Sequence, residues 1–346
     1  MVNASRGCPR PVDGRTREDQ KRPAVSPAWI VGLGLALAVA CRPAPPLVAI
    51  GLVAPFEGRD RPIGYDVLFG ARLAVRQWNA QHPNGPLALL VALDDGGDPA
   101  LAAERARQLR GHPGLIAVIG HFRPETTRAA APVYQGAGLL WVAPLIPADR
   151  APEGALPTAP DQRTMVRLLL EGLPRPPRGR LWWVWDGEEA WFGPEIIAHL
   201  REQGWEVHEA FWQDAAPRGS EPVWFDGRAV HAGEAWRRWR QEGWSGPLLG
   251  GPGLLHPDLR AFWDGSGAVR VVAETRRVTD PAWVEAYRAI ALGAEPGPYA
   301  PLGYDLAWVL LQARQAPSFR WVGRTGTWEG VSGRFWKTPL GFVGEP

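Results

Sequence analysis

The sequence predicts an α/β protein of two lobes, each a parallel sheet with helices on both faces. Two observations lead to this prediction. From residue 47 onward, short apolar runs alternate with helical patterns, and this order of elements is typical of parallel sheets. After a proline-rich passage over residues 144–160 the same alternation starts again, which indicates a second sheet. The chain has 346 residues, enough for two hydrophobic cores.

The first set of elements precedes the proline-rich passage. Its strands are continuous apolar runs, its first helix has an apolar face, and Asp98 and Gly111 are suitable start and stop residues for its second helix. The predicted strands cover residues 47–54, 87–95, 115–120 and 139–144, and the predicted helices cover 64–80, 98–111 and a segment that begins at Pro124.

The second set follows the proline-rich passage and predicts the second lobe. Strands are predicted over residues 180–186, 205–211, 222–227, 247–251 and 269–274, with helices over about 193–204 and 232–243. Two further helical stretches, 281–293 and 302–315, precede a tail rich in glycine and tryptophan. Because ligands of such sheets bind beyond the carboxyl ends of the strands, we expect a cleft where the strand ends of the lobes meet.

Charge and cysteine content exclude several classes of protein. The formal net charge is only +2 and the arginines form no cluster on one periodic face, so nothing indicates a nucleic-acid partner. The two cysteines, Cys8 and Cys41, both precede the globular part, so neither a disulfide framework nor a cysteine metal site is expected inside the fold. The 19 tryptophans predict aromatic core packing, and a stacking site for a ligand is the alternative.

The first forty residues have the pattern of an export signal. Residues 28–40 form an uncharged apolar run after a basic stretch. As a helix this run extends about 20 Å, short of the roughly 30 Å of a bilayer core, which favours a signal peptide over a membrane span. The run AVAC at 38–41 resembles the lipobox of bacterial lipoproteins, so we predict a signal peptide over 1–41, with Cys41 acylated and a membrane anchor. A buried N-terminal helix with a free thiol is the alternative.

The junction HFRPETT, residues 121–127, is a candidate anion site. It lies between a predicted strand and a helix that opens with Pro124 and Glu125, so that backbone N–H groups point outward with Arg123 just before them. Arg123 can form a bidentate contact with an anion. The alternative is that Pro124 and Glu125 only start the helix, with Glu125 at its positive end and Arg123 solvated.

Catalytic arrangements are not found in the sequence. There is no GxSxG elbow, HExxH pair or P-loop, and His112 and His121 do not have a metal-ligand spacing. Asp94 and Asp95 are interpreted as the end of a strand and the cap of a turn rather than as a catalytic pair. We therefore predict no enzyme, no cofactor and no metal site.

Three stretches carry a resemblance to a known family. Residues 50–80 begin IGLVAPFEG, residues 94–109 begin DDGGDPAL, and residues 116–144 begin IAVIGHFRP. Together these runs resemble the type I periplasmic binding proteins that serve branched-chain amino acid ABC transporters, the leucine-binding proteins among them. The similarity continues more weakly through WFGPE at 191–195 and covers most of residues 47–336.

The resemblance implies two Rossmann-like lobes joined by a three-segment hinge. In that scheme lobe 1 takes residues 42–152 plus 279–317, and lobe 2 takes residues 153–278 plus 318–346. A small ligand lies in the cleft and the lobes close around it.

The resemblance also implies positions for the ligand, and here the sequence departs from the family pattern. Amino-acid binders place Ser or Thr at the head of the helix that begins here at Pro124, where this chain has Arg123 with Thr126 and Thr127 behind it. The acidic residue that receives the ligand ammonium in leucine-type members falls near Pro252. The ligand-binding residues predicted on this basis are Phe56, Glu57, Arg123, Thr126, Thr127, Leu145, Ile146 and Phe192.

A cleft of this composition suits a molecule different from an ordinary amino acid. We expect an extracytoplasmic lipoprotein that captures an amino acid, amide or related small carboxylate and delivers it to an ABC permease, with permease subunits and the membrane as partners. One alternative is a ligand sensor or regulator with the same fold. Another is a degenerate member that binds nothing and acts structurally in the envelope.

Overall fold

A computed structural model describes residues 46–171, 173, 179–188, 191–273, 278–315, 327–330, 333–338 and 341–344. By its internal contacts the chain from Pro45 to Pro346 forms one compact unit, which contains everything described below. The predicted signal peptide over 1–41 and the anchor at Cys41 lie outside the described residues. Within the described ranges, no helix combines the length and apolar character needed to cross a membrane.

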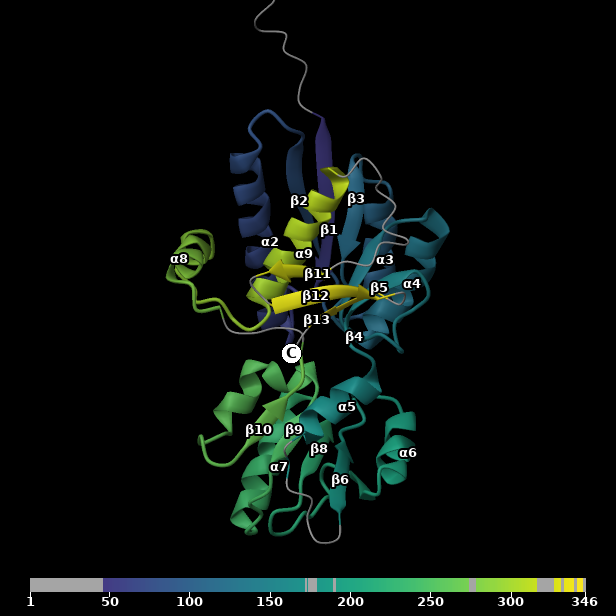
Figure 1. Ribbon diagram of the computed structural model, residues 1–346, viewed down its shortest axis with the longest axis vertical. Coiled ribbons are helices and arrows are strands. Elements are labelled where there is room, and N and C mark those ends of the chain that lie inside the picture. Colours follow the sequence, from purple (N-terminus) through teal and green to yellow (C-terminus); the bar gives the residue numbers. More distant parts are fainter. Residues whose placement is uncertain are drawn as a thin grey trace, which may run out of the picture. The chain divides into compact units, whose positions relative to one another are not determined.

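The first lobe is built on a five-stranded parallel sheet. Its strands are β1 Leu47–Ala54, β2 Leu87–Asp94, β3 Leu115–Ile119, β4 Trp141–Pro147 and β5 Ala155–Ala159. Its helices are α2 Arg61–Gln81, α3 Pro99–Arg110, α4 Pro124–Ala137, α8 Pro281–Ile290 and α9 Ala300–Gln315. The strand order is β2-β1-β3-β4-β5. Helix α2 packs against α9 and α3 against α4, and these pairs flank the sheet (Figure 1).

The second lobe repeats this architecture. Its strands are β6 Arg180–Trp185, β7 Glu206–Phe211, β8 Val223–Asp226, β9 Leu248–Gly250 and β10 Val269–Val271. Its helices are α5 Gln162–Leu170, α6 Glu195–Glu202, α7 Ala229–Gln241 and two short 3-10 helices, η1 Pro252–Leu255 and η2 Pro257–Ala261. The strand order is β10-β9-β8-β6-β7, again parallel throughout. The two parallel sheets confirm the predicted fold class.

Strand β5 is one of the elements that the sequence did not predict, together with helix α5, the two 3-10 helices and the strands of the tail. It lies inside the proline-rich passage and contains Pro157, which lacks a backbone N–H. Because β5 pairs in its sheet with β4 alone, one side of the strand needs no donor for that sheet, and proline is tolerated there. The first sheet therefore extends beyond residue 152, the predicted end of the first segment of lobe 1.

The tail forms a third, antiparallel sheet of strands β11 Thr327–Gly330, β12 Gly333–Thr338 and β13 Gly341–Gly344. Strand β13 lies beside β5 of the first sheet, although the sequence assigned residues 318–346 to lobe 2 (Figure 1). The complete division of the chain into lobes by residue range stays a prediction.

Candidate functional site

Two aspartates organise the loops at the carboxyl ends of the first-lobe strands. Asp94 Oδ1 accepts hydrogen bonds from the backbone N–H groups of Phe56, at 2.7 Å, and of Gly96, at 2.9 Å. Asp95 Oδ1 accepts the N–H of Gly97 at 3.0 Å. These bonds agree with the interpretation of the pair as a strand end and turn cap, and they fix the loops that follow β1 and β2.

Asp95 also connects this loop to the one that carries Arg123. Its Oδ2 lies 2.6 Å from Nδ1 of His121, and His121 Nε2 lies 3.2 Å from the Tyr134 hydroxyl. All three side chains are buried. Burial, with the nearby charge of Asp95, raises the pKa of Tyr134 above its ordinary range, so Tyr134 stays neutral. A buried chain of this kind holds the start of α4 in a fixed place.

Arg123 lies at the N-terminal cap of α4 and forms an ion pair. Its Nη1 donates to Asp60 Oδ2 at 2.8 Å, and both side chains are mostly buried. Gly97 makes room for this pair. It has a φ of +70°, and a Cβ there would lie 3.2 Å from Arg123 Nη1, so glycine is favoured both by conformation and by space.

A cavity of about 410 Å³ opens beside this ion pair. Its lining residues are Arg59, Asp60, Gly96, Gly97, Asp98, Pro99 and Arg123 of the first lobe together with Arg228 of the second. Three arginines thus face two aspartates. Asp60 is engaged by Arg123, and Asp98 caps α3 by accepting the N–H of Leu101. Arg59 makes no ion pair with any residue that the structure describes. The cavity is therefore suited to an anionic group.

Arg228 reaches the cavity because Asp186 holds the start of α7. The Arg228 N–H donates to Asp186 Oδ2 at 2.7 Å, and His231 Nδ1 lies 3.0 Å from the same oxygen. The Arg228 guanidinium pairs with Glu188 in the loop after β6. Arg228 follows β8 much as Arg123 follows β3, and this common position at a strand end is the signal that sequence reasoning missed.

Phe192, the site residue predicted in the second lobe, belongs to a loop held by Asp226. The carboxylate of Asp226 accepts the N–H of Trp191 at 2.9 Å and that of Phe192 at 3.3 Å. The Phe192 ring is buried edge-on against Trp224, with ring centroids 4.8 Å apart. The Phe192 ring is therefore held in a fixed position by its packing against Trp224.

Gln162 joins this loop to the end of the first lobe. It is fully buried, its Nε2 donates to Asp149 Oδ2 at 2.9 Å and to Glu195 Oε1 at 2.7 Å, and its Oε1 accepts the Gly193 N–H at 2.5 Å. The hydrogen bond from Gln162 Nε2 to Glu195 Oε1 is the largest cause of the lowered pKa of Glu195. Sequence reasoning missed Gln162, because no element was predicted between the proline-rich passage and residue 180.

The predicted apolar ligand-binding residues belong to the hydrophobic core. Leu145, Ile146 and Phe192 belong to one cluster of buried hydrophobic residues that includes both lobes, and Phe56 packs against it. Leu145 has a φ of +67°, unusual for a residue with a side chain, and its N–H donates to the Thr158 hydroxyl at 3.3 Å. None of these four residues lines the arginine-lined cavity described above, so their contact with a ligand stays a prediction.

The predicted polar ligand-binding residues differ in their surroundings. Arg123 lines the cavity described above. The Thr126 hydroxyl donates to the Arg123 carbonyl and the Thr127 hydroxyl to the His121 carbonyl, each at 3.1 Å. Both hydroxyl protons are used in bonds to carbonyl groups that immediately precede α4, so neither donates to a ligand in this arrangement. Glu57 is exposed and contributes its backbone N–H to Asp94.

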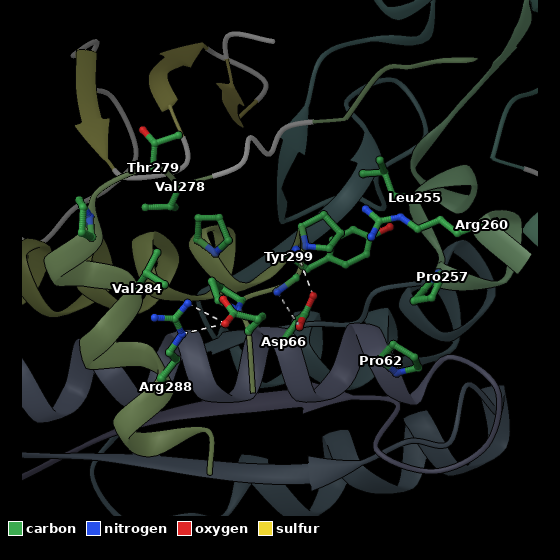
Figure 2. Close-up of a pocket in the computed structure, with 16 residues that line it drawn as sticks. Pro62, Asp66, Leu255, Pro257, Arg260, Val278, Thr279, Val284, Arg288 and Tyr299 are labelled. Carbon is green, nitrogen blue, oxygen red and sulfur yellow. Dashed lines mark hydrogen bonds and ion pairs between the residues drawn. The ribbon is translucent and has the colours of Figure 1, made fainter. Parts of the chain in front are cut away.

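A larger cavity of about 1110 Å³ has Pro62 and Asp66 of the first turns of α2 in its lining (Figure 2). It is lined by residues of α2, of the 3-10 helices of the second lobe, and of the segment from residue 278 to 301. None of the eight predicted ligand-binding residues is in its lining. In the described part of the chain, no group of three or more His, Cys, Asp or Glu side chains is arranged to hold a metal ion.

Comparison with protein families agrees with the resemblance noted in the sequence. Residues 48–170 match the family model described as "Periplasmic binding protein". A protein of Pseudomonas aeruginosa named "Amino acid binding protein" is 25% identical over 286 residues, which cover 75% of this chain and 74% of that protein.

Solved structures share the fold at lower identity. The branched-chain amino acid transporter substrate-binding protein LivJ from Streptococcus pneumoniae, in complex with isoleucine, has a TM-score of 0.68 and 19% identity, covering 86% of this chain and 94% of its own. A solute-binding protein of an ABC transporter from R. palustris, in complex with 4-hydroxybenzoate, has a TM-score of 0.65 and 15% identity, covering 86% and 90%.

Proposed function

We propose that this chain, whose residues 48–170 belong to the periplasmic binding protein family and whose fold is that of the type I members, is a solute-binding protein for a small acidic molecule. Of the solute classes expected from the sequence, which are an amino acid, an amide or a related small carboxylate, the cavity favours the small carboxylate. The protein captures it between the lobes and delivers it to an ABC permease.

The observation that carries the proposal is the convergence of three arginines from two lobes. Arg59 and Arg123 come from strand ends of the first lobe and Arg228 comes from the second, and all three line one cavity of about 410 Å³. A carboxylate is held best by such guanidinium groups, because they offer charge-assisted, paired hydrogen bonds. A solute that contacts both lobes stabilises their closed arrangement.

The relatives support this class of solute. The similar protein from P. aeruginosa is named for amino acids, and one structural neighbour holds isoleucine while another holds 4-hydroxybenzoate. Each of these ligands carries a carboxylate, and the last carries no ammonium group. In this chain Arg123 is paired with Asp60 and Arg228 with Glu188, whereas Arg59 makes no ion pair with any described residue, so Arg59 is the most evident partner for a carboxylate.

The test is binding measured by calorimetry and thermal shift with the purified protein and a panel of small carboxylates, including isoleucine and 4-hydroxybenzoate, each beside the amide in which the carboxylate is replaced by an uncharged group. A ligand at a hundred times its Kd adds about 2.7 kcal/mol to stability. Arg123→Ala is expected to weaken carboxylate binding by roughly ten- to a hundredfold, since it removes a charge-assisted contact.

Arg107→Ala is the matched control, because Arg107 is an exposed arginine on α3 outside the cavity lining. It is expected to bind like the unaltered protein. Equal binding of acids and amides, or wild-type affinity in both Arg123→Ala and Arg228→Ala, would reject the anionic site.

We propose a lipid anchor at Cys41 and an extracytoplasmic location as part of the same function. Support comes from the basic stretch, apolar run and AVAC sequence at the start of the chain, and from the family matched by residues 48–170. In cells that express the full gene, mass spectrometry is expected to find an acylated N-terminal cysteine, and Cys41→Ser is expected to leave the membrane fraction. An unmodified Cys41 in a retained N-terminal segment would contradict the anchor.

A further inference from the structure

Tyr299 makes a direct hydrogen bond between the two lobes. It lies just before α9 of the first lobe, and its hydroxyl donates to the carbonyl oxygen of Pro252, the first residue of η1 in the second lobe, at 2.7 Å. The Tyr299 side chain is buried, so water competes poorly for this bond. A single phenolic group thus connects segments that belong to different sheets.

Asp66 holds the backbone of Tyr299 in place. It lies in the first half of α2, and its two carboxylate oxygens accept the N–H of Gly297 at 3.2 Å and of Tyr299 at 3.4 Å (Figure 2). The approach is close enough that a Cβ on Gly297 would lie 2.0 Å from Asp66 Oδ2. Residue 297 must therefore stay glycine for α2 to carry the segment that presents Tyr299.

A second interlobe contact reaches the same short segment of the second lobe. His256, between η1 and η2, lies with Nε2 3.0 Å from the Arg59 carbonyl oxygen. Its Nδ1 accepts the Asp258 N–H at 3.3 Å, so Nε2 carries the proton and donates to Arg59. The segment over residues 252–261 is therefore attached to the first lobe at two points, the Tyr299 hydroxyl and the Arg59 carbonyl oxygen.

We propose that Tyr299, positioned by Asp66, is a latch that holds the two lobes of this protein in their closed arrangement. The inference rests on the proposed function, in which a solute is enclosed between the lobes. Tyr299 and Asp66 line the cavity of about 1110 Å³ and not the arginine cavity, so the latch acts on closure without touching the acidic solute. Opening the lobes breaks the phenol–carbonyl bond, and its loss shifts the equilibrium toward the open form.

The test measures the distance between the lobes in the full chain without added ligand. Spin labels are attached through Arg107→Cys on α3 and Glu234→Cys on α7, two exposed positions, in a background with Cys8→Ser and Cys41→Ser. Tyr299→Phe removes only the hydroxyl and is expected to move the closed-to-open ratio about five- to tenfold toward open, the effect of one buried hydrogen bond. Asp66→Asn is expected to shift the ratio in the same direction.

Tyr304→Phe is the matched control. The Tyr304 hydroxyl donates to Gln77 Oε1 at 2.6 Å, a bond within the first lobe, so its removal is expected to leave the label distances unchanged. The latch is rejected if Tyr299→Phe has the distance distribution of Tyr304→Phe, or if the unaltered chain is already open. Because no ligand is added, this result is independent of carboxylate binding, whose failure would reject the proposed function instead.

Discussion

Replacing Trp224 with alanine is expected to lower the free energy of unfolding by about 3–5 kcal/mol. Trp224 lies on β8 and is completely buried. Its ring is stacked on Trp183 at a centroid distance of 5.2 Å and meets the edge of Phe192 at 4.8 Å. The substitution leaves a cavity that rigid strands on both sides cannot fill, and it removes the surface on which Phe192 rests.

Denaturant unfolding monitored by circular dichroism measures this loss, and Trp224→Phe is the control. The indole N–H of Trp224 has no hydrogen-bond partner among the described residues, so phenylalanine removes an unsatisfied donor and leaves a much smaller cavity. It is expected to cost less than half as much as alanine. A loss below about 1 kcal/mol for Trp224→Ala would show that this aromatic stack is not an important part of the second-lobe core.

The second large expected effect is a dependence of stability on pH that comes from Asp66. Burial raises its pKa from 3.8 to about 6, against the lowering effect of the N–H groups of Tyr299 and Gly297. The neighbouring charged and titratable groups are Tyr287 and Arg288 of α8, Glu295 in the following loop and Arg260 of η2.

The sign of this pH dependence follows from the number of protons that the folded and the unfolded protein bind. Between pH 4 and 6 the folded protein keeps a proton on Asp66 that the unfolded chain has lost, so this group makes stability fall as pH rises through that window. The total effect is at most roughly 3 kcal/mol, reached above pH 6. Glu195 acts in the opposite direction, because its lowered pKa adds stability that is lost as pH falls.

Asp66→Asn isolates this effect from that of the other carboxyl groups. Unfolding free energies of both proteins are measured by denaturant titration from pH 4 to pH 7.5, and the difference between the two curves is taken. The unaltered protein is expected to lose stability relative to the variant as pH rises from 4 to 6. A difference that stays constant across this window would contradict the raised pKa of Asp66.

Most of the fold was predictable from local pattern. In both lobes the apolar runs and helical patterns became parallel strands and flanking helices, because the period of apolar residues depends on local burial. Strand β5 was missed, since Pro157 lowers the strand signal and only the end position in the sheet permits it. The tail was missed because its antiparallel sheet has no alternation with helices.

Less of the candidate site was predictable. Arg123 could be identified at a strand–helix junction, because that position depends only on the order of elements along the chain. The hydroxyls of Thr126 and Thr127 looked available for a ligand, but in the structure they donate to the carbonyl groups of Arg123 and His121, just before the helix. Which of two acceptors a hydroxyl chooses depends on distances of a few tenths of an ångström, and sequence spacing does not contain them.

The sequence by itself determined the two parallel sheets, the place of Arg123 at the head of a helix and the absence of a disulfide framework from the globular part. Only the tertiary structure decided that Arg228 and Arg123 line one cavity and that Gln162 links two loops. It also decided that Asp66 holds the backbone of Tyr299, whose hydroxyl contacts the other lobe. The reason is physical. Periodicity records whether a residue is buried, whereas the partner of a buried polar group comes from a distant part of the chain and is fixed only when the sheets are assembled.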